Sequence, residues 1–144
     1  MRNDIYYATL ERIYRHFVIE QNPPGVIDGF IRYHHGSSGD AVDVDCPCAI
    51  GLLDDQYQLS EPPLADLSVI ELRDEHPEVL AALLNVDGID DADADFLDLI
   101  QSKHDYHAAE AHRKRWRPIE TFRREMADAL EGIARVYGLP KLSF

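Results

Sequence analysis

Apolar residues recur every three or four positions near both ends of the chain, which is the spacing of one face of a helix. Near the N-terminus they are Ile5, Tyr6, Leu10, Ile13, Tyr14, Phe17 and Val18. Near the C-terminus they are Ile119, Phe122, Met126, Leu130, Ile133, Ala134 and Tyr137. Asp4 can cap the first helix, and the two prolines within residues 21–25 must end it. Gly138 and Pro140 are typical of the residues that follow a helix, so the second helix should end near residue 137.

Three more helices are predicted between these two. A short one is expected near residues 64–74, and another over residues 76–86, where Pro77 suits the first turn. A third helix is expected within residues 87–107, because aspartates are favoured at the positive end of the helix dipole. Its apolar residues Phe96, Leu97 and Ile100 share a face, and His104 extends that face.

The stretch CPCAIGLLDDQYQL (residues 46–59) predicts a further helix start, with Asp45 as the cap and Pro47 in the first turn. Cys48, Ile50 and Leu53 should then enter the core. One short extended segment is expected near residues 26–45. At 144 residues the chain is the size of one domain. We therefore expect a mainly α protein, a compact bundle of five to six helices forming a single domain over residues 1–144.

Charge narrows the classes of function. The chain has 27 acidic and 14 basic residues, a formal net charge of −13. This charge disfavours direct binding to nucleic-acid phosphates or to an anionic membrane. No window is apolar enough to span a membrane and no signal peptide is evident, so we expect a cytoplasmic protein. The basic run at residues 113–117 is interpreted as a solvated helix surface or linker, with nucleic-acid binding as the third alternative.

The acidic middle of the chain suggests a binding surface. The aspartates of residues 87–98 that we expect to contribute are Asp87, Asp90, Asp91, Asp93 and Asp95. Acids on one face can steer a protein toward a basic surface and supply contacts around an interface. The leading hypothesis is therefore a non-enzymatic module that binds or inhibits another protein through a basic macromolecular surface.

A thiol enzyme is the principal alternative, with Cys48, His104 and Asp105 as catalytic residues. A cysteine in the first turn of a helix has its pKa lowered by the dipole, and a histidine can act as its base. Neighbouring residues on a helix point about 100° apart. We therefore expect that an aspartate other than Asp105 would have to orient His104. The simpler interpretation is that Cys48 packs in the core.

A zinc site is a second form of this alternative. Cys46 and Cys48 could join His104 and His107, because thiolates and imidazoles suit tetrahedral zinc. The C-x-C spacing of the cysteines is, however, less typical of zinc sites than C-x-x-C. The expectation is no metal and no cofactor.

Two motifs resemble a pattern found in small, largely uncharacterised bacterial and phage proteins. The pattern has C-A-I-G-x-L-x-x-D and later F-L-x-x-L-Q-x-x-H-D. The matching residues are Cys48, Ala49, Ile50, Gly51, Leu53 and Asp54 or Asp55, then Phe96, Leu97, Ile100, Gln101, His104 and Asp105. A tryptophan and a C-terminal helix follow in the pattern, as Trp116 and Tyr137-Gly138-Leu139 do here. The resemblance implies a shared helical fold and names no activity, and Cys46 lies outside it.

Overall fold

The computed structural model describes residues 2–22, 26–27, 30–31, 48–55, 58–59, 64, 67–114 and 118–142. In this part of the chain it has six α-helices, which confirms the predicted mainly α fold. They are α1 (Arg2–Tyr14), α2 (Ala49–Leu52), α3 (Val69–Glu75), α4 (Pro77–Leu84), α5 (Asp91–Lys114) and α6 (Pro118–Val136). A π-helical stretch, η1 (Arg15–Ile19), continues α1, and two short strands, β1 (Val26–Ile27) and β2 (Phe30–Ile31), pair antiparallel. That residues 1–144 form a single domain stays a prediction.

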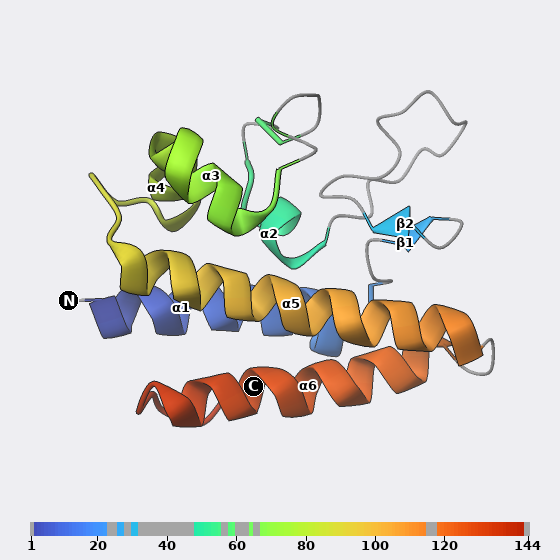
Figure 1. The fold of residues 1–144 in the computed structure, drawn as a ribbon. Helices are drawn as coiled ribbons and strands as arrows, with labels where there is room; N and C mark the ends of the chain where they lie inside the picture. The colour runs from blue at the N-terminus through green and yellow to red at the C-terminus, as the bar shows by residue number, and fades with distance from the viewer. Residues whose placement is uncertain are drawn as a thin grey trace.

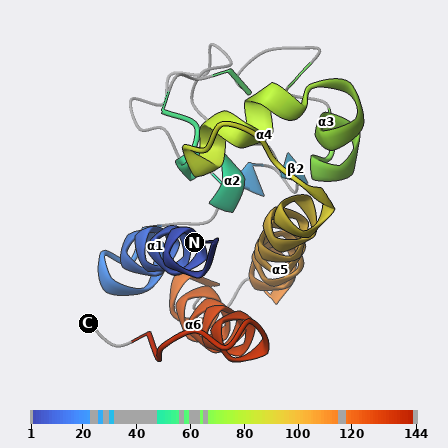
Figure 2. The same ribbon diagram turned by 90° about the vertical axis from the view of Figure 1, so that its left-hand side faces the viewer.

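Three long helices form one layer of the molecule. α1, α5 and α6 run side by side, and Figure 2 shows them nearly end-on as a triangle. The short helices α2, α3 and α4 lie on the other side of α5 from α6 (Figure 1). α5 packs against α6 on one side and against α2 and α3 on the other. Residues on α5 are therefore in a position to connect the two layers.

Aromatic rings fill the space between the long helices. The ring of Tyr6 stacks on Phe96 with 3.9 Å between centroids. Phe17 meets Phe122 edge to face at 5.3 Å, and all three phenylalanines are fully buried. Such contacts contribute beyond the area that the rings bury. Most of the apolar positions that the helical spacing selected, among the side chains that the structure describes, therefore lie in the core.

The ends of several helices follow the expected signals. The helical stretch that begins with α1 ends at Ile19, and Gln21 adopts a positive φ of 57° before the first prolines. Pro77 opens α4, and Asn85 ends it in the left-handed conformation. Gly138 has φ +67°, and the N–H of Leu139 donates to the carbonyl of Ala134 at 2.8 Å. These ends confirm the predicted stops.

Two predicted helix starts were wrong. α3 begins at Val69, because Ser68 and Glu71 form a reciprocal capping box that fixes the start there. α2 is a single turn capped by Cys48; Asp45 and Pro47 lie outside the described residues. The strands β1 and β2 agree with the extended segment, whose residues 32–45 are also outside the described part. Among the described residues, no helix is long and apolar enough to cross a membrane.

Candidate functional site

A chain of polar side chains crosses the boundary between α2 and α5. The thiol of Cys48 accepts a hydrogen bond from the N–H of Gly51 at 3.4 Å. The N–H of Ile50 donates to Gln101 Oε1 at 3.0 Å, and Gln101 Nε2 donates to Asp105 Oδ1 at 2.7 Å. The single turn of α2 is thus fixed to α5 through Gln101. The matches to the second motif, Gln101 and Asp105, lie beside the first motif.

His104 belongs to the same chain of contacts. Its Nδ1 lies 3.0 Å from Asp105 Oδ1, and its ring is fully buried between Phe17 and Phe122. The expectation that Asp105 points away from His104 was wrong. Nδ1 is the ring nitrogen nearest the backbone, so a carboxylate on the next residue reaches it despite the angular offset. The structure therefore joins His104 to Asp105 and connects Asp105, through Gln101, to the turn that Cys48 caps.

Burial works against a reactive thiol in this arrangement. Cys48 is fully buried, which raises its thiol pKa to about 12, and the nearby Asp105 carboxylate raises it as well. The N–H of Gly51 and the Gln101 amide oppose this shift without reversing it. The predicted lowering of the pKa was wrong, because α2 is one turn long and its cap residue is shielded from water. A protonated thiol is a poor nucleophile, so the contacts favour a structural role.

The four proposed zinc ligands are not brought together in the described part of the chain. Cys46 lies outside it. His107 Nδ1 lies 2.8 Å from Glu125 Oε2 on α6, so this imidazole is engaged in a contact between α5 and α6. No group of three or more His, Cys, Asp or Glu among the described side chains could hold a metal ion. The zinc alternative therefore gains no support from these residues.

The five aspartates proposed as a binding surface divide into two kinds. Four of them are exposed: Asp87, Asp90, Asp91 and Asp95. Asp93 is fully buried and cannot contribute to a surface. Its Oδ1 accepts from the Tyr6 hydroxyl at 2.6 Å and lies 3.1 Å from Arg2 Nε. Its position in the sequence run gave no sign of this, because the contact depends on α1 lying beside the start of α5.

Asp93 also fixes the start of α5 with Asp90. The N–H of Asp93 donates to Asp90 Oδ1 at 2.9 Å, and the N–H of Asp90 donates to Asp93 Oδ2 at 3.1 Å. This is a reciprocal capping box built from two aspartates. Arg2 Nη2 also donates to the carbonyl of Gly88 at 2.9 Å. The acidic segment is therefore held in one conformation against the N-terminus of α1.

The four exposed aspartates are called the acidic patch below. Among the described side chains, Arg73 approaches it, with Nη1 3.9 Å from Asp91 Oδ1, but Arg73 also contacts Asp74 at 3.1 Å. Further along α5, partial burial raises the pKa of Asp98, and the carboxylates of Asp95 and Asp105 raise it further. Burial therefore accounts for the larger part of the cost of ionising Asp98, and repulsion from these carboxylates for the rest. A cation brought to the patch would relieve that repulsion.

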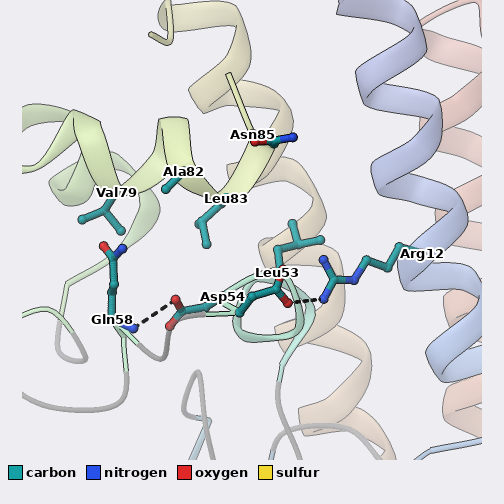
Figure 3. A pocket seen from close by; sticks show the side chains of 9 residues that line it. Arg12, Leu53, Asp54, Gln58, Val79, Ala82, Leu83 and Asn85 are labelled. Carbon is teal, nitrogen blue, oxygen red and sulfur yellow. Dashed lines mark hydrogen bonds and ion pairs between the residues drawn. The ribbon is translucent and has the colours of Figure 1, made fainter. Parts of the chain in front are cut away.

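Beside the patch, two adjoining hollows lie between α1, α4 and the end of α2. Their volumes are about 400 and 340 Å³, and they share the lining residues Arg12, Leu53, Leu83 and Asn85. Figure 3 shows Val79 and Leu83 of α4 facing Leu53, Asp54 and Gln58, with Arg12 reaching in from α1. Sequence reasoning missed these hollows, because they depend on how α1 and α4 sit side by side. The sequence carried one sign of the hollows. Ala8 and Ala82 have small side chains, so each leaves part of the surface of its helix accessible.

Arg12 and Asp54 make the main polar contacts in the lining of the hollows. Arg12 Nη2 contacts Asp55 Oδ1 at 2.6 Å and donates to the carbonyl of Leu52 at 2.9 Å. Buried Asp54 accepts from the N–H groups of Gln58 at 3.0 Å and Leu59 at 2.7 Å. These contacts hold Leu52, Asp54 and Asp55 in place along one side of the hollows.

Comparisons with models of protein families, with curated proteins and with solved structures gave no match. The resemblance of the two motifs to small bacterial and phage proteins therefore stays a prediction. Contacts, burial and charge are the grounds for inferring what this chain does.

Proposed function

We propose that this protein is a non-enzymatic module that binds a basic surface of another protein through the acidic patch. The observation that carries the proposal is that four carboxylates, Asp87, Asp90, Asp91 and Asp95, are exposed on a segment held rigid by Asp93 and Arg2. A fixed array of charges loses little conformational entropy when a partner binds.

The charge of the rest of the molecule supports the same proposal. With a net charge of −13, the field of the whole chain attracts cationic partners and raises their rate of association. Partial burial is the main cause of the raised pKa of Asp98, and the neighbouring carboxylates of Asp95 and Asp105 add to it, so negative groups lie near one another on α5. Lysine or arginine side chains of a partner would lower this repulsion on binding.

The patch can be tested with a fluorescein-labelled lysine octapeptide as the basic probe. The test variant neutralises three of its aspartates: Asp87→Asn, Asp91→Asn and Asp95→Asn. Asp90 is kept, because it caps α5. We expect this variant to bind the peptide roughly tenfold more weakly at low salt, since three favourable charge contacts are lost. Fluorescence anisotropy measures the affinity.

A charge-matched variant separates the patch from net charge. It neutralises three exposed acids elsewhere: Glu20→Gln, Glu120→Gln and Asp128→Asn. Both triple variants change the net charge from −13 by three, to −10. We expect the matched variant to bind the peptide nearly as well as the wild type. Equal weakening in the two variants, or wild-type binding that is unchanged between about 20 and 150 mM salt, would show the proposal to be wrong.

A further inference from the structure

The two hollows adjoin, and together they are called the groove here, with α1 on one wall, α4 on the other and Leu53 between them. Figure 3 shows the larger of the two. Val79 and Leu83 line it from α4 but are buried, at 4% and 8% exposed, whereas Ile5 of α1 is partly exposed. Each wall also carries an exposed alanine, Ala8 on α1 and Ala82 on α4. A small side chain on each wall keeps the groove open where larger residues would fill it.

The charges along the groove are complementary to a cation. Asp4 lines one hollow and Asp55 lines the other, and both are exposed, whereas Asp54 is buried and accepts from the N–H groups of Gln58 and Leu59. Arg12 is already held by Asp55 and by the carbonyl of Leu52, so an incoming anion would have to displace these contacts. The groove therefore favours a ligand that is apolar where it meets α4 and positively charged at the end nearest Asp4 and the acidic patch.

The groove is continuous with the acidic patch. Asn85 lines both hollows and adopts the left-handed conformation that ends α4. The chain then runs through Asp87 to the start of α5, and the bond from Arg2 to Gly88 holds this turn against α1. A segment that lies in the groove and leaves it beside Asn85 would meet the patch within a few residues.

We infer that the groove between α1 and α4 binds a segment of the partner protein that carries apolar side chains followed by lysine or arginine. The apolar side chains lie against Ile5, Ala8 and Ala82, and the basic ones reach Asp4 and the acidic patch. This inference rests on the proposed function and adds the chemistry of the segment that is recognised. The patch supplies attraction, and the groove supplies selectivity for apolar residues beside the basic ones.

Two peptides of equal charge separate the contribution of the groove to binding from that of the acidic patch. One is a short fluorescein-labelled peptide of leucines and lysines, and the other has serine in place of every leucine. We expect the wild-type protein to bind the leucine–lysine peptide the more tightly. Ala8→Gln and Ala82→Gln each narrow the groove from an exposed helical position without changing charge, and glutamine is a good helix former. Ala109→Gln, at an exposed position on α5, is the matched control.

Each groove variant should weaken binding of the leucine–lysine peptide by roughly tenfold, the cost of losing one well-packed apolar contact. Neither should affect the serine–lysine peptide, and Ala109→Gln should affect neither peptide. Wild-type binding by both groove variants, with weakening only by the triple aspartate variant, would overturn the groove and leave the proposed function standing. If the groove variants weakened binding and the triple aspartate variant did not, the proposal of a basic partner would be wrong. Circular dichroism melting of each variant confirms that it is folded.

Discussion

Asp93 and Asp95 show how differently two aspartates of one acidic run are used. Asp93 is fully buried and contacts Tyr6 and Arg2, while Asp95 is exposed two residues later. A buried carboxylate is tolerated only when its oxygens have partners, and both oxygens of Asp93 have them. Burial of the Tyr6 hydroxyl beside this carboxylate raises the pKa of Tyr6. The pair links the start of α5 to α1.

Replacing Asp93 should therefore destabilise the fold far more than replacing Asp95. Asp93→Ala leaves the Tyr6 hydroxyl buried without its acceptor and removes the capping box, at a cost of about 2–4 kcal/mol. Asp95→Ala should change the free energy of unfolding by no more than about 0.5 kcal/mol. Urea unfolding followed by circular dichroism measures both. Similar losses in the two variants would contradict the structural role of Asp93.

Cys48 should make stability depend on pH at alkaline values. Its thiol pKa rises from 9.0 to about 12 on folding, so above pH 9 the unfolded chain ionises while the folded one does not. Stability is fully present below pH 9 and falls toward pH 12, by at most about 1.4 kcal/mol per pH unit. Cys48→Ala should make the decline between pH 9 and 10 less steep than in the wild type, while the part due to Tyr6, whose pKa is also raised by burial, stays the same in both proteins. An unchanged slope in urea unfolding would contradict the buried thiol.

At the scale of elements, α2 is the least self-sufficient helix. One turn of four residues is too short to be stable alone, so it depends on its contacts with the rest of the fold. Those contacts are the buried side chains of Ala49 and Ile50 and the bond from Ile50 to Gln101. The stability of α2 is therefore set by α5.

Gln101→Ala should loosen α2 without unfolding the protein. The N–H of Ile50 loses its acceptor, and the expected cost is about 1–3 kcal/mol. Because Cys48 caps this turn, its thiol should then react faster with a disulfide reagent under native conditions. The neighbouring exposed residue supplies the control, Ser102→Ala, which should leave the rate unchanged. If thiol reactivity were the same in all three proteins, Gln101 would not be what holds α2 in place.

The sequence allowed the long helices to be predicted and left the short ones uncertain. Apolar spacing and the stop signals at Gly138 and Pro140 located α6, and Pro77 marked the start of α4, because both depend on local chemistry. The extent of α2 depends on Asp54, which binds the N–H groups of Gln58 and Leu59 and so ends the helix. In the candidate site, pattern alone identified Cys48, His104 and the exposed aspartates. The groove and the burial of Asp93 arise from contacts between α1 and distant parts of the chain, which no local pattern reports.

At the scale of the whole molecule, the acidic patch and the groove meet at the same end. The N-terminus of α1, the end of α4 and the start of α5 meet there (Figure 1); the acidic patch lies at this junction, and the groove runs from it between α1 and α4 to the residues that follow α2. The contacts of Asp93 and the cap that it forms with Asp90 stabilise this end, while Asp87, Asp91 and Asp95 take no part in that cap and are exposed. Asp90 is therefore the member of the patch that both holds the segment and is proposed to bind.

The most direct test of the basic-partner proposal is to determine where on the protein a basic probe binds. Titrating the lysine octapeptide into ¹⁵N-labelled protein, followed by two-dimensional NMR, reports each backbone amide separately. We expect the largest shift changes at residues 87–98 and near Asn85, with little change at Glu120 and Asp128 on α6. Those changes should shrink as salt rises toward about 150 mM, because exposed charges are screened. Shift changes spread evenly over all exposed acids, or centred on α6, would contradict the account.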